Sequence, residues 1–322
     1  MVEQQLFKIL EHYFLTNFLR PRTQDSYRQV LEKFIGRLHE IELDSIHNLT
    51  VEALLEWRVY ELREKGLSST SWNTYCRTLR ALFNHAVAHR LVNWPENHFN
   101  QLLVRTSKKR KKTLSPQQIS LTYDLLNKLV YAEAVETYSG RIHPAWFWKT
   151  VFETLYYTGI RRNQLLNIRL QDLCLHSGTI FLSLNGSKTH QEHVIPIPEE
   201  LRASLTDLIL RAKRKQFNGE DQLFNVTRFG KTDHQRRYRY TVMHDSNISN
   251  CFRELSGKLG FPISPHRLRH TLGTNLMRQP EKNLHLVKTL LGHSDIRTTL
   301  EYVEPDMEDV RHLLNTMPKL VK

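Results

Sequence analysis

The stretch from Ser264 to Tyr302 constrains this chain more than any other part of the sequence. It begins S-P-H-R-L-R-H-T and ends L-L-G-H-S-D-I-R-T-T-L-E-Y. Ser264 and Pro265 form a helix start, because serine caps free N–H groups and proline fits the first helical position. His266 and Arg269 lie three residues apart and therefore share one face of that helix. Because this face lies in the first turns, its free N–H groups and the helix dipole attract an anion.

A second helix is predicted at residues 284–291, and Gly292 follows it as a natural left-handed cap. His293 comes directly after that cap, and a third helix is predicted to start at Ser294 or Asp295. Together, these features of the stretch point to phosphate chemistry.

Tyr302 is expected on the third helix but away from its apolar face. Ile296, Leu300 and Val303 fall on one stripe by their i, i+4, i+7 spacing. At 3.6 residues per turn, Tyr302 lies roughly 120° from that stripe. A lone tyrosine near a C-terminus is usually a packing residue, but this position and the upstream histidines and arginine favour a functional one.

In this order and spacing, the residues resemble the tyrosine recombinases, also called phage integrases. The family pattern is H-x-x-R, then L-G-H, then a nucleophilic tyrosine nine residues further on. Here it matches His266, Arg269, residues 291–293 and Tyr302. The resemblance implies that His293 hydrogen-bonds the phosphate or buttresses Tyr302.

Two further members of the family's catalytic set are found by the same resemblance. The family has T-G-L-R where this chain has a Thr-Gly turn followed by Arg161. The family's next residues usually end in Ser-Glu, whereas this chain has Asn163 and Gln164, which puts a contact made by the carboxylate in doubt. Lys188 sits in a predicted hairpin turn. A lysine there is usually only solvated, but in the family this turn carries the general acid.

The set so identified suits phosphoryl transfer without a metal, nucleotide or other cofactor. Arg161 and Arg269 would hold the non-bridging oxygens of a phosphodiester by bidentate, permanently charged hydrogen bonds. Tyr302 would attack, with His266 as the candidate base, because a tyrosine hydroxyl is a poor nucleophile until it loses its proton. Lys188 would protonate the leaving sugar oxygen. A covalent 3′-phosphotyrosine link would then conserve the bond energy for rejoining.

Composition points to a polyanionic partner. The chain has 322 residues with a formal net charge of +13, and its pI is about 9.7. A basic balance this large favours nucleic acid, with a merely basic surface as the alternative. A chain of this length is enough for two ordinary domains.

Cysteine usage and hydropathy indicate a cytoplasmic protein, which DNA binding would associate with the nucleoid. Cys76, Cys174 and Cys251 are far apart, which fits a reducing compartment. No apolar signal core and no run of ~20 apolar residues is present. His190 and His193 have no Cys or carboxylate at ligand spacing, so no metal site is expected.

Residues 1–104 are predicted to form a helical domain. Apolar periodicity indicates four helices, at about residues 4–18, 23–38, 51–65 and 68–87. Thr23, Tyr27, Leu31 and Phe34 also match the T-x-x-x-Y-x-x-x-L-x-x-F pattern of the family's core-binding, SAM-like domain. The resemblance implies that this domain binds DNA.

Residues 105–113 are predicted to be a basic interdomain linker that lies along a DNA backbone, with a solvated hinge as the alternative. Its basic residues are Arg105, Lys108, Lys109, Arg110, Lys111 and Lys112. Residues 228–240 are basic and rich in tyrosine, and we expect a loop there whose Arg236 and Arg237 also contact DNA.

Residues 114–322 are predicted to form the catalytic domain and its C-terminal tail. Helices are expected at about residues 114–137, 143–158, 199–217, 246–259 and 306–317, and a β-hairpin is expected from strands at residues 179–184 and 193–197. The predicted fold class is mainly α, with a small antiparallel hairpin or sheet in the second domain of a two-domain tyrosine recombinase architecture.

The resemblance further implies a homo-tetramer on two DNA duplexes, with a dimer on each site and the C-terminal segment docking on a neighbour. Accessory DNA-bending or directionality proteins are possible partners. Three alternatives stay open at this point. A type IB topoisomerase would relax supercoils without synapsis, a silent regulator would bind DNA without cutting it, and a metal-dependent nuclease would be sensitive to EDTA.

Affinity for DNA should come mostly from phosphate contacts. With some 6–10 such contacts, the binding constant is expected to fall by about 10³–10⁵ between 50 and 200 mM salt, because counterions are released on binding. Fluorescence anisotropy with a labelled duplex checks this. Binding that is insensitive to salt would contradict the assignment of the basic surface to DNA.

Overall fold

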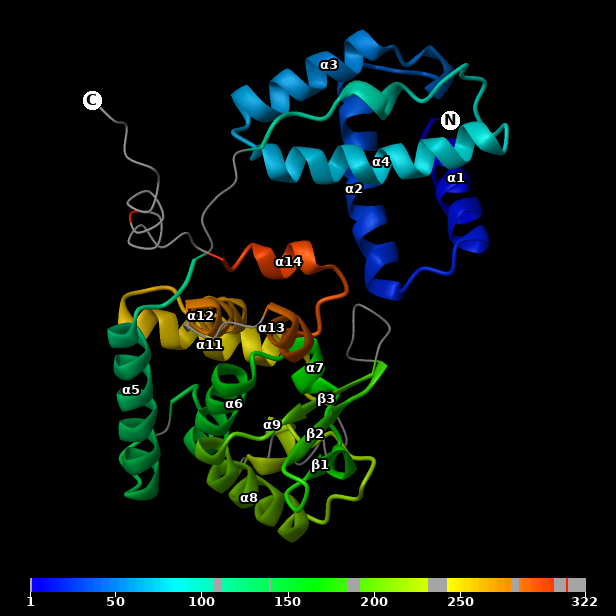
Figure 1. The fold of residues 1–322 in the computed structure, drawn as a ribbon. Coiled ribbons are helices and arrows are strands. Elements are labelled where there is room, and N and C mark those ends of the chain that lie inside the picture. Colours follow the sequence, from blue (N-terminus) through cyan, green and yellow to red (C-terminus); the bar gives the residue numbers. More distant parts are fainter. Residues whose placement is uncertain are drawn as a thin grey trace, which may run out of the picture. The chain divides into compact units, whose positions relative to one another are not determined.

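The computed structural model describes residues 2–106, 112–138, 140–184, 192–230, 242–278, 284–303 and residue 311. The chain divides into two compact units, residues 1–109 and residues 110–322 (Figure 1). Arg105 and Lys112 are described and exposed. Several residues and one helix named above lie outside the described residues: Lys108, Lys109, Arg110, Lys111, Lys188, Arg236, Arg237 and the helix expected at 306–317.

The first unit is helical, as the sequence predicts. Its helices are α1 Val2–Thr16, α2 Pro21–Glu40, α3 Val51–Val59 and α4 Ser69–Ala88, with 3₁₀ turns η1 Ile46–Asn48 and η3 His98–Gln101. A π-helical turn, η2 Tyr60–Glu64, extends α3. Thr50 and Ser68 cap α3 and α4 by accepting backbone N–H bonds, and Pro21 occupies the first position of α2.

An aromatic cluster fills the core of this unit. Phe34 of α2 lies with its ring centroid 5.4 Å from Trp57 of α3, 6.0 Å from Phe83 of α4 and 5.5 Å from Phe99 of η3. Trp57 meets Trp72 edge to face at 5.0 Å. These rings join four helical segments, which is why the segment after α4 folds back onto the bundle.

That returning segment is fastened by the first turn of α4. Asn73 is buried, and its amide both donates to the carbonyl of Val104, at 2.8 Å, and accepts from the Val104 N–H, at 2.9 Å. Trp72 donates its indole N–H to the carbonyl of Leu102 at 2.8 Å. The backbone just before the basic segment is therefore held by side chains rather than by secondary structure.

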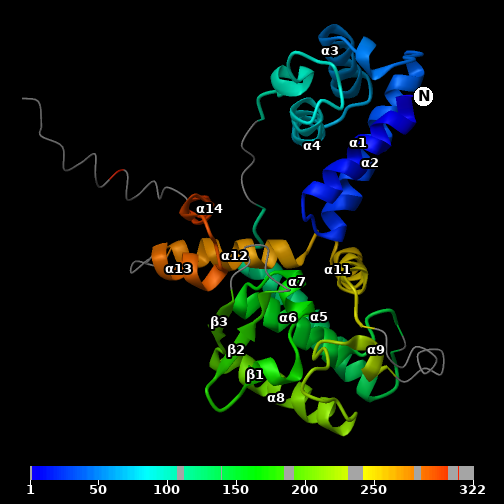
Figure 2. The same ribbon diagram turned by 90° about the vertical axis from the view of Figure 1, so that its right-hand side faces the viewer.

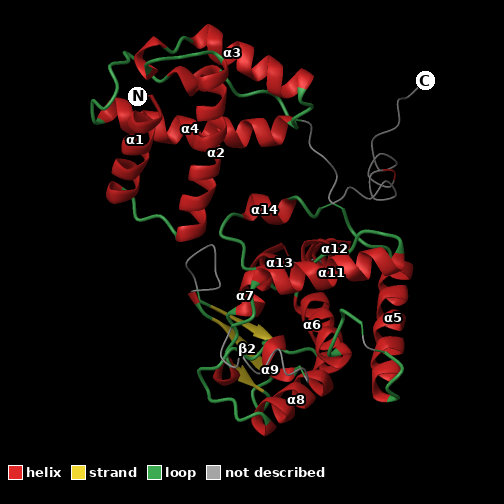
Figure 3. Cartoon of the chain, turned by 180° about the vertical axis from the view of Figure 1, so that it is seen from behind, coloured by secondary structure: helices red, strands yellow, loops and turns green. Residues whose placement is uncertain are grey.

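The second unit combines helices with one small sheet. Its helices are α5 Pro116–Ala134, α6 Ala145–Thr158, α7 Arg162–Leu166, α8 Glu199–Arg214, α9 Val226–Phe229, α11 Asp245–Leu259, α12 Pro265–Arg278, α13 Leu284–Leu291 and α14 Ile296–Leu300, with a 3₁₀ turn η4 Leu170–Asp172. The buried helix α6 stands between α5 on one side and the sheet with α8 on the other (Figure 3). Helices α11, α12 and α13 form a layer across one end of α6 (Figure 2).

The sheet has three antiparallel strands in the order β1-β2-β3, which are Leu173–Cys174, Thr179–Leu182 and His193–Pro196. Ile180 pairs with Ile195, and both are buried against the core of this unit. The predicted hairpin is confirmed as β2 and β3. The strand β1 was not predicted, because two residues carry no periodic signal.

Two predicted helix ends differ from the structure. The sequence placed the start of α11 at about residue 246, whereas the helix starts at Asp245 after His244, whose backbone N–H donates to the Asn247 side chain at 3.0 Å. The last helix of the site, α14, ends at Leu300, so Tyr302 lies just beyond it. No helix in the described ranges is both long and apolar enough to cross a membrane.

The two hydrogen bonds between Asn73 and the Val104 backbone lead to a prediction about stability. Asn73→Ala should lower the free energy of unfolding of the first unit by about 1–3 kcal/mol, because it leaves the Val104 N–H and carbonyl without their buried partner. Urea denaturation followed by tryptophan fluorescence measures this. Thr74→Ala, at an exposed neighbouring position on α4, is the matched control and should change stability by less than about 0.5 kcal/mol.

Candidate active site

The polar residues of the Ser264–Tyr302 stretch converge on one face of α12. Ser264 accepts from the Arg267 N–H at the start of this helix, as predicted, at 3.3 Å. His266 is exposed in the first turn, while Arg269 and His270 in the next turn are buried. Because α12 packs against both α6 and α13, its second turn faces the ends of those two helices.

Arg269 is 4% exposed and acts as the centre of the cluster. Its guanidinium donates to the carbonyl of Gly159 at 2.6 Å, to the carbonyl of Leu291, and to Nε2 of His293 at 3.0 Å. It is also hydrogen-bonded to the side chain of Tyr302. Burial, with the nearby Arg161 charge as a further cause, lowers the pKa of Arg269 to about 10, which still leaves it protonated at neutral pH.

Arg161 lies beside Arg269 and points at a second helix end. It precedes α7, and both of its terminal nitrogens lie 3.3 Å from the carbonyl of Gly292. Burial lowers its pKa from the ordinary value, and the neighbouring Tyr302 raises it in part. Gln164 accepts the Arg161 backbone N–H at 2.8 Å, so an amide oxygen makes a contact here without the carboxylate that the family carries at this position.

Two glycines in the left-handed backbone conformation leave carbonyl groups at helix ends that the two arginines contact. Gly159 ends α6 with φ +62°, and Gly292 follows α13 with φ +59°. The last carbonyls of a helix have no partner inside it and carry the negative end of its dipole. Here Arg269 and Arg161 supply those partners, so each arginine is held at a helix end by charge and by hydrogen bonds.

His293 is fixed in one neutral form by its two neighbours. Because a guanidinium can only donate, Nε2 of His293 must accept from Arg269. The ring proton is then on Nδ1, which donates to the Thr299 hydroxyl at 2.8 Å. Its ring also lies parallel to that of Tyr302, with centroids 5.8 Å apart. His293 therefore links the arginine, the tyrosine and α14.

Tyr302 is 2% exposed and lies against α12. Its hydroxyl is 3.0 Å from Nδ1 of His270. A methyl group added at Gly273 would come within 2.9 Å of Cδ1 of the Tyr302 ring, so the tyrosine occupies the space that the missing side chain leaves. Its aromatic ring also packs with Met277, Val287 and Leu291 in a small apolar cluster.

The apolar stripe expected on α14 does not face the protein core. Ile296, Leu300 and Val303 are 42%, 48% and 39% exposed, while Tyr302 beside them is buried. Helical phase correctly separated Tyr302 from the stripe, but it assigned the buried side to the wrong residues. The contacts of His293 and Gly273 with Tyr302 set the orientation of this short segment.

Three residues of the cluster, His270, Gly273 and Thr299, were not predicted from the sequence. His270 had a signal, because it lies four residues after His266 and therefore on the same helical face. Gly273 follows Arg269 by four residues, but a helical glycine alone does not predict what packs on it. The role of Thr299 becomes visible only in the structure, where its hydroxyl contacts the His293 ring.

Lys188 lies outside the described residues, so its position relative to the cluster stays a prediction. The adjoining strand β3 contacts the site through His193, whose Nε2 is 3.2 Å from the carbonyl of Leu290. Within the part of the chain that the structure describes, no three His, Cys, Asp or Glu side chains are grouped as metal ligands.

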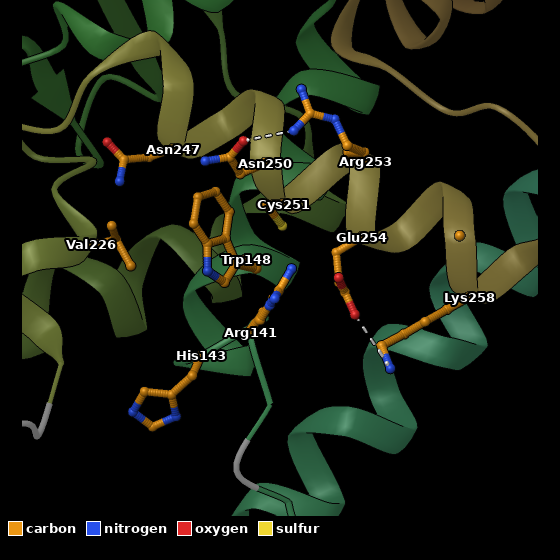
Figure 4. Close-up of a pocket in the computed structure, with 11 residues that line it drawn as sticks. Arg141, His143, Trp148, Val226, Asn247, Asn250, Cys251, Arg253, Glu254 and Lys258 are labelled. Atoms are coloured by element: carbon orange, nitrogen blue, oxygen red, sulfur yellow. Dashed lines mark hydrogen bonds and ion pairs between the residues drawn. The ribbon is translucent and has the colours of Figure 1, made fainter.

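A cavity of about 660 Å³ lies elsewhere in the second unit (Figure 4). It is lined by α11 and by residues 141–148, including Arg141, Trp148 and Cys251, and by none of the residues clustered around Arg269. The motif residues Arg161, Arg269, His293 and Tyr302 meet away from this cavity, so the residues around Tyr302 are the candidate site.

The comparison with known families agrees with this arrangement. The model of the "Phage integrase family" matches residues 133–309, more than half of the chain, and the "Phage integrase, N-terminal SAM-like domain" matches residues 8–90. The chain belongs to the phage integrase family. The sequence-based recognition of a tyrosine recombinase is thereby confirmed.

Relatives of this integrase-family chain carry corresponding names. A proposed tyrosine recombinase XerC of Pseudomonas syringae is 37% identical over 98% of this chain and 64% of its own length. A protein of the same name from Pseudomonas aeruginosa is 37% identical over 98% of this chain and 71% of its own length.

The fold is also found among solved structures. The integrase of transposon Tn1549, in complex with a circular intermediate DNA, aligns over 97% of this chain and 99% of its own, with a TM-score of 0.71 and 18% identity. The predicted fold class, mainly helical with a small antiparallel sheet in a two-domain tyrosine recombinase architecture, is confirmed.

The contact between Gly273 and Tyr302 can be tested without any substrate. Gly273→Ala should expel the ring, and overpacking should lower the free energy of unfolding by about 1–3 kcal/mol despite the better helix propensity of alanine. Nitration by tetranitromethane, located by peptide mass spectrometry, should then modify Tyr302, which resists it in the wild type.

Gly257→Ala is the matched control. Gly257 is also inside a helix, α11, but an added methyl group meets nothing within 4 Å. This change should raise stability by about 0.5–1 kcal/mol and leave Tyr302 protected. If Tyr302 stays equally protected in Gly273→Ala, the packing described here is wrong.

Proposed function

We propose that this protein is a site-specific DNA recombinase that cuts and rejoins strands through a covalent 3′-phosphotyrosine intermediate. The observation that carries the proposal is the position of the Tyr302 hydroxyl, which is hydrogen-bonded to Arg269 and lies 3.0 Å from Nδ1 of His270. A buried tyrosine hydroxyl beside a buried guanidinium fits a nucleophile waiting for an anionic substrate.

Arg161 and Arg269 are proposed to bind the scissile phosphate. Both carry a positive charge and are already oriented by the carbonyls at the ends of α6 and α13. Preorganised donors of this kind stabilise the charge that develops on the non-bridging oxygens, and losing one typically lowers the rate by roughly 10²–10³. His293 accepts a hydrogen bond from Arg269 and stacks on Tyr302. It is proposed to hold these two side chains in position relative to the phosphate.

The proposed reaction has two transesterification steps. Tyr302 attacks phosphorus, the P–O5′ bond breaks, and Lys188 protonates the leaving O5′. A 5′-hydroxyl of the partner strand then attacks the phosphotyrosine and releases Tyr302. The number of phosphodiester bonds is unchanged, so ATP is not required. Arg161 and Arg269 would stabilise the phosphate charge in place of a metal ion. His266, at the exposed start of α12, is proposed as a further member of the catalytic set.

The two units are proposed to share the DNA. Residues 1–104 would form the core-binding domain, residues 105–113 would follow the DNA backbone, and residues 114–322 would carry out catalysis. Arg105 and Lys112, both exposed, and the basic residues between them would supply phosphate contacts, as would Arg236 and Arg237. Recombination of two sites would take a homo-tetramer, a dimer on each duplex, with accessory DNA-bending proteins as further partners.

Covalent capture tests this function even though the target sequence is not known. The wild type is incubated in EDTA with a pool of random duplexes and quenched with SDS, and protein-linked DNA is recovered and sequenced. The wild type should enrich one sequence, and Tyr302→Phe should give no adduct although thermal unfolding shows that it is folded at the assay temperature.

Tyr131→Phe is the matched control, since Tyr131 is 71% exposed on α5, and it should form adduct like the wild type. An adduct that still forms with Tyr302→Phe would contradict the assignment of Tyr302 as the nucleophile. A wild type that binds duplex DNA but links to no member of the pool would favour a silent regulator, and an adduct lost in EDTA would favour a metal-dependent enzyme.

A further inference from the structure

The Tyr302 hydroxyl has a partner that the catalytic set does not include. His270 is buried on the face of α12 that Tyr302 covers, and its Nδ1 lies 3.0 Å from the tyrosine oxygen. The two rings are tilted, with centroids 5.4 Å apart, so the contact is made at the ring edge where Nδ1 lies. A hydroxyl and a ring nitrogen at this distance form an ordinary hydrogen bond.

The donors and acceptors indicate which atom carries the proton of this bond. A tyrosine hydroxyl has one proton to donate and lone pairs to accept with, whereas a guanidinium can only donate. The bond between Arg269 and the Tyr302 side chain therefore uses Tyr302 as the acceptor. The arrangement that satisfies both contacts has the Tyr302 O–H donating to Nδ1 of His270, with the histidine neutral and its own proton on Nε2.

From this geometry, and resting on the proposed function, we infer that His270 is the base that takes the proton of Tyr302 during DNA cleavage. The Oη–P bond forms as the P–O5′ bond breaks, and the Tyr302 proton moves to Nδ1 of His270, which becomes an imidazolium. A separate proton, proposed to come from Lys188, reaches the leaving O5′. During rejoining His270 returns its proton to Tyr302.

This inference moves the base by one helical turn from His266, the residue that the sequence predicts. His266 is exposed and meets His270 edge to face, with ring centroids 4.0 Å apart. Its position at the start of α12 suits a contact with the phosphate or with His270, whereas His270 is the histidine whose nitrogen lies at the tyrosine oxygen.

The surrounding charges favour proton transfer when DNA is bound. Arg269 from α12 and Arg161 from the start of α7 bring two positive charges to the site, His266 lies beside His270, and His293 packs on Tyr302 in its neutral form. Without a phosphate these charges oppose a third positive charge on His270. A bound phosphate offsets them, so the imidazolium forms where its charge is neutralised.

The test uses a cleavable duplex built on the sequence that the wild type captures. Cleavage rates are measured with the ordinary phosphate and with a 5′-bridging sulfur at the scissile position, because a thiolate leaves without protonation. Cleavage of the sulfur substrate therefore does not need a proton for the leaving group. The proton transfer that can still limit its rate is the one from the Tyr302 hydroxyl. The variants are His270→Asn and His270→Ala. The matched control is His176→Asn, at an exposed histidine in the turn between β1 and β2.

The His270→Asn variant shows whether His270 acts as a base or only positions Tyr302. Its side-chain oxygen can accept the Tyr302 hydrogen bond near the position of Nδ1, but it cannot take the proton. We expect His270→Asn and His270→Ala to cleave about 10²–10⁴-fold more slowly than the wild type at neutral pH on both substrates, and His176→Asn to match the wild type. On the sulfur substrate, the rate of His270→Asn should rise about tenfold per pH unit between about pH 6 and 9, because hydroxide must then remove the proton.

Two results would overturn the inference. One is a His270→Asn variant that cleaves within about twofold of the wild type. The other is a His270→Asn rate that is lowered equally at every pH, which would indicate a structural role. Thermal unfolding and nitration of Tyr302 are measured alongside, and His270→Asn decides the question if His270→Ala does not fold. Since every assay uses DNA that the wild type cleaves, either result leaves the proposed function intact.

Discussion

The second unit is built around one buried positive charge. A guanidinium removed from water is tolerated only where hydrogen bonds and partial charges replace its hydration. Arg269 meets that requirement with the last carbonyls of α6 and α13 and with a ring nitrogen of His293. Because each of these partners belongs to a different segment, the charge fixes where α6, α13 and the residues after Gly292 lie relative to α12.

The same arrangement stabilises two helix ends and orients two arginines. Carbonyls at a helix C-terminus need donors, and the left-handed glycines at 159 and 292 turn the chain so that these carbonyls face Arg269 and Arg161. The arginines therefore do not depend on substrate for their orientation. Bond networks of this kind let a site bind an anion with little rearrangement, which is how preorganised donors lower an activation barrier.

Tyr302 is placed by packing rather than by its own helix. The helix α14 is only five residues long and ends before the tyrosine, so it contributes little to orienting the ring. The missing side chain at Gly273 provides the space, His293 covers one face of the ring, and His270 and Arg269 hold the hydroxyl. Burial of the nucleophile in this way leaves the apolar residues of α14 exposed to the surface.

The sequence by itself determined the family, the helical class and the hairpin, along with most of the helix ends near the site. These follow from local signals: caps at Thr50, Ser68 and Ser115, a glycine after α6 and α13, and alternation in β2 and β3. It also selected Arg161, His266, Arg269, His293 and Tyr302 by motif. Local chemistry specifies such features because each depends on residues within one or two turns of chain.

Only the tertiary structure decided which atoms of those residues meet. The bond from Tyr302 to His270 joins positions 32 residues apart, and those from Arg269 to Gly159 and His293 join positions 110 and 24 residues apart. Periodicity along one helix cannot predict which side of a five-residue helix turns inward, because packing with other segments sets that choice. The neutral form of His293 and the proton on Tyr302 follow only from these long-range donors and acceptors.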